Sequence, residues 1–298
     1  MKEECLMKIY ISADMEGATG VTDVVQTMES RSEYAFGCRM MAHDVRAAAL
    51  GALKAGADEI LVNDAHGRKI NIDIAALGGN GAVRLLSGTP KPLGMMEGLD
   101  ESFDGVFFIG YHAMAGTPGA VLDHTVSGRT VYSVSLNGRE VGELGLNAAV
   151  ASELGVPVAL VEGDDALERE VRELLGEDAV YACVKKAKGR YAADCLVPGG
   201  EPPVSAVPGA PVNAFELIRS KAEEAVRLIA DGRAPQMNMG TGAFELRITF
   251  HTTAQCDAAC QIPLLKRIGG RTVELRGTGM AEMRRWSGAI IGLASTAG

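Results

Sequence analysis

The fold of this chain is decided by one strand-like run and the polar turn behind it, KIYISADMEG at residues 8–17. The run 8–13 is mostly apolar, as a buried strand requires. Two acids, Asp14 and Glu16, follow it at once, and Gly17 comes next. Ligands of open α/β sheets bind beyond the carboxyl ends of the strands, so we expect these acids to lie at a binding crevice.

Two further apolar runs end in the same way. Residues 59–63 precede the motif that contains His66, and residues 106–110 precede His112. Each motif is flanked by glycine, which permits a tight turn after the strand. Three strand ends are therefore expected to bring two carboxylates and two imidazoles to one crevice, a set of ligands that suits zinc above other metals.

Strand and helix signals alternate along the chain. The expected strands are 8–13, 59–63, 106–110, 158–162 and 245–252. The expected helices are 33–55, 142–154, 213–230 and 279–297. Alternation of this kind indicates a mostly parallel sheet covered by helices on both faces, a three-layer α/β/α architecture.

A smaller α/β region is expected after residue 212. Residues 197–212 contain five prolines and are interpreted as a linker, which divides the chain into a metal-binding catalytic domain, 1–196, and a C-terminal region, 213–298. Before the linker, the alternating pattern at 130–141 holds Asn137-Gly138, a strong signal for a β-hairpin.

Composition narrows the class of protein. The 298 residues carry 29 basic against 38 acidic side chains, a net charge of −9, and no basic cluster predicts nucleic-acid binding. No segment reaches the ~20 apolar residues of a membrane span, and the start lacks the pattern of a signal peptide. The six cysteines are scattered, so we expect reduced thiols in a cytoplasmic protein, with Cys256–Cys260 the one disulfide worth considering.

The acidic pair can serve a metal or a turn. Asp14 and Glu16 are two residues apart, so both carboxylates can face one cation, and without a cation they would repel each other. In the alternative, Asp14 only accepts hydrogen bonds from nearby backbone amides. We favour metal binding, because the pair follows a buried strand and precedes Gly17 and Gly20.

The histidines allow a similar choice. A lone histidine is usually structural, but Gly67 follows His66 and Asp64 precedes it, where the carboxylate can orient the ring of a metal ligand. The same argument applies to His112. We interpret both as ligands.

Glu143 stands at the start of a predicted helix. An acid there often serves only the helix dipole, and for this residue alone that explanation is favoured. The flanking Gly142 and Gly145 instead indicate close packing around a site. With Glu143 there are five candidate ligands, too many for one tetrahedral zinc with an open position, which favours two metals sharing a carboxylate in a hydrolase.

Seven motifs in one order resemble the M55 peptidase family, the zinc-dependent D-aminopeptidases of the dipeptide-transport type. They are SADMEG (12–17), LVNDAH (61–66), MEGLD (96–100), GYHA (110–113), TPG (117–119), VGELGLN (141–147) and GDD (163–165). The resemblance implies a self-compartmentalising homodecamer that holds two Zn²⁺ per subunit. It further implies that the enzyme cleaves short D-amino-acid peptides, such as D-Ala-D-Ala, from the N-terminus.

The same resemblance assigns the ligands. Carried over by motif, Asp14 bridges the two zinc ions. Glu16 and His112 bind one ion, and His66 and Glu143 bind the other.

Two further residues are candidates for chemistry. From the residues alone, His124 is a catalytic acid or base, a nucleophile, or a structural residue; the resemblance implies the catalytic histidine of the family. Arg190 is either an exposed surface arginine or a bidentate partner for a substrate carboxylate.

Other functions remain open from the sequence. Another metal-dependent hydrolase, such as an L-peptidase, amidase or phosphoesterase, can use the same ligands. A metal- or peptide-binding protein without turnover is a further alternative. A nucleotide-binding protein is disfavoured, because the first turn carries acids that would repel phosphates.

Overall fold

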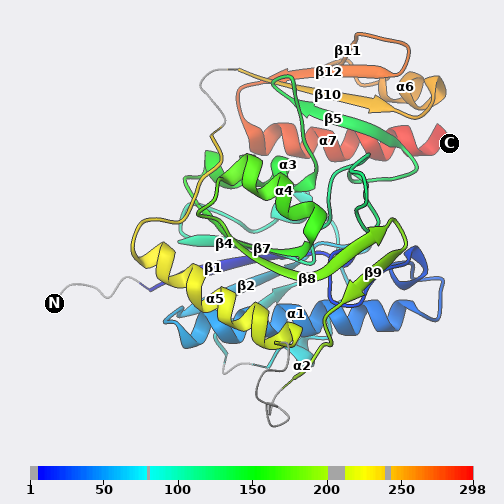
Figure 1. The fold of residues 1–298 in the computed structure, drawn as a ribbon. Coiled ribbons are helices and arrows are strands. Elements are labelled where there is room, and N and C mark those ends of the chain that lie inside the picture. The colour runs from blue at the N-terminus through cyan, green and yellow to red at the C-terminus, as the bar shows by residue number, and fades with distance from the viewer. Residues whose placement is uncertain (1–5, 79–80, 201–211, 239–242, 298) are drawn as a thin grey trace.

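The computed structural model describes residues 6–78, 81–200, 212–238 and 243–297, and its centre is a seven-stranded sheet (Figure 1). The strand order is β3-β2-β1-β4-β7-β8-β9. The bounds are β1 Lys8–Ala13, β2 Glu59–Asp64, β3 Val83–Leu86, β4 Gly105–Ile109, β7 Val158–Asp164, β8 Val180–Gly189 and β9 Ala192–Cys195. All neighbours pair in parallel except β8 with β9, so the mostly parallel sheet is confirmed.

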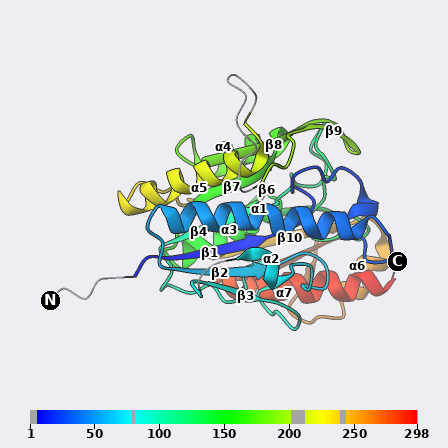
Figure 2. The ribbon, with the colours of Figure 1, turned by 90° about the horizontal axis from the view of Figure 1, so that it is seen from below.

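Helices cover both faces of this sheet. They are α1 Tyr34–Lys54, α2 Ile74–Leu77 and α5 Ala214–Ala230 on one face, with α3 Glu143–Glu153 and α4 Asp165–Leu175 on the other. Figure 2 shows α1 and α5 side by side. Side chains alternate across β1, so Ile9 and Ile11 pack beneath α1 and α5, whereas Tyr10 joins the core on the α3 face. The predicted three-layer architecture is confirmed.

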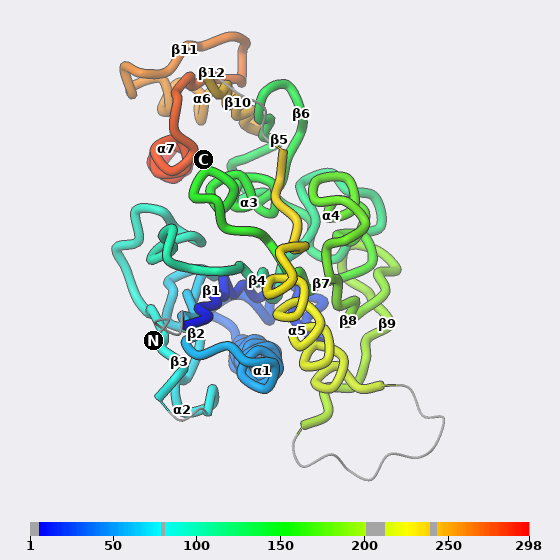
Figure 3. The backbone as a smooth tube through the Cα atoms, turned by 90° about the vertical axis from the view of Figure 1, so that its left-hand side faces the viewer, coloured from blue at the N-terminus to red at the C-terminus, as the bar shows by residue number. Residues whose placement is uncertain are grey.

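A second, five-stranded sheet lies beyond α3. Its order is β11-β12-β10-β5-β6, and every pairing is antiparallel. The bounds are β5 Val131–Leu136, β6 Arg139–Glu140, β10 Phe244–Phe250, β11 Lys266–Arg267 and β12 Thr272–Gly277, with α6 Thr253–Ala259 and α7 Met280–Ala294 beside them. Figure 3 shows α7 between this sheet and α3, and one apolar core joins all three.

The predicted elements agree with the structure to within two residues at each end, except that the predicted helix 279–297 is α-helical only to Ala294. The expected strand 245–252 ends earlier, at Phe250, because Thr252 caps α6 with its side chain. The predicted hairpin at Asn137-Gly138 joins β5 to β6. Three short 3₁₀ helices, η1 Val24–Gln26, η2 Gly94–Met96 and η3 Ser295–Ala297, complete the elements of the described residues.

The division of the chain at 197–212 stays a prediction about folding units, and residues 201–211 lie outside the described ranges. The two sheets do not follow this division. Helix α5 comes after the predicted linker but packs on α1 of the first layer, because its apolar face matches that side of the sheet. Strands β5 and β6 come before the linker but belong to the second sheet.

Two simpler expectations concern cysteines and membranes. The described cysteines, Cys38, Cys183, Cys195, Cys256 and Cys260, are free thiols, so Cys256 and Cys260 are not bridged. Within the described ranges, none of the helices has the length and apolar character needed to cross a bilayer.

Candidate metal centre

The predicted ligands meet at the carboxyl edge of the seven-stranded sheet. Asp14 and Glu16 follow β1, His66 follows β2, and His112 follows β4. Strand β1 lies between β2 and β4, so the three turns are neighbours. Glu143 is the first residue of α3, which covers this part of the sheet.

One group consists of Asp14, Glu16 and His66. The Nδ1 atom of His66 lies 3.2 Å from Asp14 Oδ1 and 3.0 Å from Glu16 Oε2. Its other ring nitrogen, Nε2, lies 2.9 Å from the carbonyl oxygen of Thr27. A proton on Nε2 that is donated to this carbonyl leaves Nδ1 as the free ligand atom.

A second group consists of His112, Glu143 and His124. His112 Nε2 lies 3.1 Å from Glu143 Oε1, and His124 Nε2 lies 3.8 Å from the same oxygen. The two imidazole rings stack, with centroids 3.9 Å apart and planes 9° from parallel. Glu143 Oε1 also accepts a hydrogen bond of 2.8 Å from the backbone amide of Val126. In each group, one possible ligand atom per residue lies within 4.8 Å of the others.

Asp14 lies between the two groups. Its Oδ1 atom faces His66, and its Oδ2 atom lies 3.5 Å from His112 Nε2. A carboxylate with one oxygen toward each group has the position expected of a bridging ligand. The grouping of the other ligands differs from the expected pairs, because Glu16 lies with His66 and Glu143 lies with His112. The pairing by zinc ion therefore stays a prediction.

The turn that carries Asp14 depends on a close approach of two backbones. The amide of Gly17 donates to the carbonyl of Gly110 at 2.8 Å, and the amide of Asp14 donates to Ile109 at 2.8 Å. A Cβ atom at Gly17 would stand 1.8 Å from the carbonyl oxygen of Tyr111. Only glycine at position 17 lets the turns after β1 and β4 lie this close.

A buried lysine holds the same turn from behind. The ammonium of Lys185 donates to the carbonyls of Glu16, Ala18 and Val21 at 2.7, 3.0 and 2.6 Å. Lys185 is on β8, far from the turn in sequence, and nothing in its surroundings along the chain marks it. It fixes the backbone that presents Glu16.

The pKa values of the two carboxylates in the first group shift in opposite directions. Burial and the neighbouring carboxylate of Glu16 raise the pKa of Asp14, against opposing contacts with His66. Burial also raises the pKa of Glu16, but the charge of His66 outweighs it and holds this pKa well below its usual range. Burial lowers the pKa of His66, yet Glu16 and Asp14 bring it well above its ordinary value.

The second group also pairs a histidine of raised pKa with a carboxylate of lowered pKa. Burial lowers the pKa of His112, but contact with Glu143 and the charges of Asp14 and Glu16 raise it to about 10. Burial raises the pKa of Glu143, whereas contact with His112 lowers it to about 2. Protons on His66 and His112 therefore offset the charge of the carboxylates in the metal-free site.

The residues fit zinc. His112 Nδ1 lies 3.0 Å from the carbonyl of Ala113, while Nε2 is buried and makes no aligned hydrogen bond within the described part of the chain. Glu16 Oε2 is in the same situation. Buried polar atoms are normally hydrogen-bonded, so an unpartnered ligand atom in each group indicates a cation at this centre.

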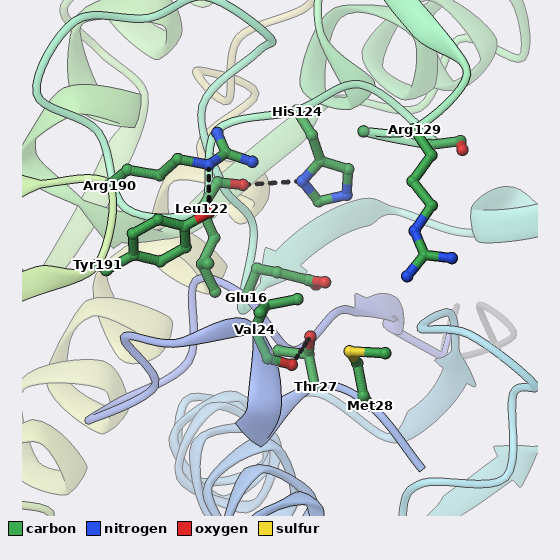
Figure 4. Close-up of a pocket in the computed structure, with 11 residues that line it drawn as sticks. Glu16, Val24, Thr27, Met28, Leu122, His124, Arg129, Arg190 and Tyr191 are labelled. Carbon is green, nitrogen blue, oxygen red and sulfur yellow. Dashed lines mark hydrogen bonds between the residues drawn. The ribbon is translucent and has the colours of Figure 1, made fainter. Parts of the chain in front are cut away.

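An outer pocket opens beside this centre (Figure 4). It has a volume of about 380 Å³, and its walls include Glu16, Leu122, His124, Arg129, Arg190 and Tyr191. The Nδ1 atom of His124 lies 2.8 Å from the carbonyl of Leu122, which fixes the ring with Nε2 free. Arg190 lines the pocket as expected, but its guanidinium is paired with the side chain and carbonyl of Asp123.

An inner pocket of about 200 Å³ shares Glu16 and His124 with the outer one. Its walls also include Asp14, His66, Glu143 and two residues that the sequence analysis missed, Lys69 and Arg284. Lys69 lies three residues after His66, just beyond the motif, and this closeness was the available signal. Arg284 occupies the apolar stripe of α7 between Met280 and Ser287, where an arginine is unexpected.

A mostly parallel α/β sheet that gathers carboxylates and imidazoles at the carboxyl ends of its strands defines the class of protein, an α/β metallohydrolase. The chain belongs to the Peptidase_M55 D-aminopeptidase family, whose model matches residues 7–289. The predicted family is therefore confirmed.

A sequence comparison and a solved structure illustrate the likeness. The chain is 40% identical to the D-aminopeptidase of Bacillus subtilis (strain 168) over 192 residues, which cover 64% of this chain and 68% of that protein. A solved structure, described as the Zn-dependent D-aminopeptidase DppA from Bacillus subtilis, a self-compartmentalizing protease, is similar with a TM-score of 0.86. The identity there is 32%, and the match covers 97% of this chain and 98% of that chain.

Proposed function

We propose that this protein is a dinuclear-zinc aminopeptidase that hydrolyses short D-amino-acid peptides such as D-Ala-D-Ala from the N-terminus. One observation carries the proposal: Asp14 turns one carboxylate oxygen toward each of two groups of buried ligands. The family and the zinc-dependent relative support the metal and the substrate class.

The ligands of the two zinc ions are Asp14, Glu16, His66, His112 and Glu143. When bound, zinc polarises the scissile carbonyl and lowers the pKa of water, which provides the nucleophile at neutral pH. The protein's own part is to present these side chains together, on turns that glycines and Lys185 hold in place.

His124 is proposed to exchange protons with the reacting peptide. Its Nδ1 atom is engaged by the carbonyl of Leu122, so the exposed ring nitrogen is Nε2, at the point where the outer and inner pockets meet. Stacking on His112 limits its rotation. From this position Nε2 can deliver a proton to the leaving amine nitrogen.

The assembly and location are also proposals. We infer a homo-oligomer, a decamer as the family resemblance implies, and the self-compartmentalizing relative supports this. A cytoplasmic location is supported by the free thiols of the described cysteines. Sedimentation equilibrium of the purified protein tests the assembly, and a monomer would contradict it.

The experiment for the function is release of amino acids from D-Ala-D-Ala and from L-Ala-L-Ala by the zinc-loaded protein, before and after chelation. We expect metal-dependent release from the D-dipeptide alone. Release from the L-dipeptide would keep a metallopeptidase but remove the D-specific assignment. No release from either, with turnover of p-nitrophenyl phosphate, would make the protein a phosphoesterase.

A further inference from the structure

Two cations line the inner pocket together with the candidate metal ligands. They are Lys69, after β2, and Arg284, on α7. Neither takes part in the zinc site proposed above. Their positive charge is opposite in sign to that of the carboxylates that line the same pocket.

Arg284 is buried, with 6% of its surface exposed. Its Nε atom donates to Asn147 Oδ1 at 3.2 Å, and its Nη1 atom donates to Ser287 Oγ at 3.3 Å. Both partners are neutral, and no carboxylate of the described residues lies within ion-pair distance. The remaining nitrogen, Nη2, lies beside Gly94, another residue of the pocket wall, and has no hydrogen-bond partner within the described ranges.

Lys69 reaches the pocket from a strained backbone. Its φ angle is +66°, in the left-handed region that lysine rarely adopts. The ammonium donates to the carbonyl of Ala65 and, in the described part of the chain, forms no ion pair. Strained backbone of this kind clusters at active sites and ligand-binding segments.

Two like charges in one small pocket are unfavourable for the unliganded protein. Burial lowers the pKa of Lys69, and the charge of Arg284 opposes its protonation further, although Asp14 and Glu143 favour it. Burial likewise lowers the pKa of Arg284, against the charge of Glu143. A cation taken out of water without an ion pair is costly, so an anion bound in this pocket within reach of both cations would offset the cost.

A chain of hydrogen bonds places Arg284 relative to the metal ligands. Asn147 holds its Nε atom and also donates to the hydroxyl of Tyr111 at 3.0 Å, which contacts Ser12 Oγ at 2.7 Å. Ser12, Tyr111 and Asn147 lie two, one and four residues from Asp14, His112 and Glu143. These hydrogen bonds therefore hold the guanidinium in a fixed position relative to the metal ligands.

We propose that Lys69 and Arg284 bind the free α-carboxylate of a short peptide whose scissile bond lies at the metal centre. This rests on the proposed peptidase function. The outer pocket is the weaker candidate, because Arg190 is already paired with Asp123 and Arg129 is exposed. A carboxylate site on the inner wall selects peptides short enough for the C-terminus to reach it.

The test measures binding without turnover. The ligand is the reduced-bond analogue of D-Ala-D-Ala, in which a methylene replaces the scissile carbonyl, offered with a C-terminal carboxylate or carboxamide. Titration calorimetry on the full-length, zinc-loaded protein should show the carboxylate binding on the order of 10- to 100-fold more tightly, the worth of charge-assisted hydrogen bonds. In Arg284→Gln this preference should disappear.

Arg285→Gln is the matched control, because it removes the same charge from the next, exposed residue of α7. It should keep the wild-type preference. Lys69→Gln gives a second variant if Arg284→Gln does not fold, and it should reduce the preference as well. Zinc content, measured by atomic absorption, should be unchanged in all three.

Equal affinity of the wild type for both analogues, or no binding of either, would overturn the proposal. So would an undiminished preference in the folded Lys69→Gln and Arg284→Gln variants. If the wild type prefers the carboxylate but does not hydrolyse D-Ala-D-Ala, the peptidase function fails while the anion site stands.

Discussion

The two sheets of this molecule treat charged side chains in opposite ways. On the five-stranded sheet, Arg247 and Arg276 alternate with Glu245 and Glu274 across β10 and β12 at N–O distances of 2.7 to 3.3 Å. Each of these four charges has an opposite neighbour. At the carboxyl edge of the seven-stranded sheet, buried charges instead share a small space with too few hydrogen bonds.

The difference teaches how to separate structural from functional charges. Cross-strand ion pairs at a surface contribute little and need no ligand. Buried carboxylates, imidazoles and cations without full sets of partners are costly, and they persist because something else completes them. The edge of the first sheet is therefore where removal of a side chain should matter most.

The largest effect is expected for His112→Ala. The ring is buried between Asp14 and Glu143, and it is a proposed zinc ligand. Loss of a residue that merely orients a ligand costs about 10–100-fold, so loss of a ligand should exceed this. We expect release of D-alanine from D-Ala-D-Ala to become undetectable while far-ultraviolet circular dichroism stays unchanged.

Zinc content shows whether activity is lost because zinc no longer binds. It should fall in His112→Ala relative to the wild type. Wild-type turnover by this variant would remove His112 from the metal site.

The next effect concerns stability. Gly17→Ala places a Cβ 1.8 Å from the carbonyl oxygen of Tyr111, and backbone atoms cannot move away as a side chain can. We expect a loss of about 3 kcal/mol or more in the free energy of unfolding, measured in urea. Gly288→Ala is the matched control, because its Cβ meets nothing within 4 Å and alanine is the better helix former. Equal stability of the two variants would contradict the close approach.

The ends of the strands that carry the metal ligands could be predicted from the sequence. The turns after β1, β2 and β4 could be predicted to meet, because consecutive parallel strands present the same edge and each turn is marked by its own polar residues. Helix bounds such as Tyr34–Lys54 followed from apolar periodicity and the glycine behind them.

What could not be predicted depends on contacts between distant segments. Composition indicated a loop after residue 196 but not that α5 would return to α1, or that β10 would pair with β5. Arg284 comes near Glu143 only because α7 packs on α3. The available signal was that Arg284 interrupts the apolar stripe of α7. This pattern marks the residue as unusual, but it does not predict which residues Arg284 contacts.

The third prediction concerns pH. In the folded, metal-free protein the pKa of His112 is about 10, against an ordinary value of 6.5. A raised pKa stabilises the folded state fully below the unfolded value, and the stabilisation is lost as the pH rises through the folded value. We expect the unfolding free energy of the chelated protein to fall between about pH 6.5 and 10, by on the order of 1–3 kcal/mol.

Scanning calorimetry at several pH values measures this change. His112→Gln should flatten the dependence, and an unaltered slope in that variant would exclude His112 as its source. Zinc needs the neutral imidazole, so added zinc should stabilise the wild type more at the alkaline end of the range.

The smallest effect is expected on the five-stranded sheet. Arg276 contacts Glu245 and Glu274 at 2.7 and 2.8 Å, but its side chain is 66% exposed. Solvent and salt screen such pairs, so Arg276→Gln should change Tm by no more than about 2 °C and leave turnover unchanged. Arg284→Gln makes the same substitution at a buried, unpaired arginine. A larger loss of peptide binding in Arg276→Gln than in Arg284→Gln would reverse the distinction between the two sheets, because it would place the functional charge among the paired residues of β10 and β12.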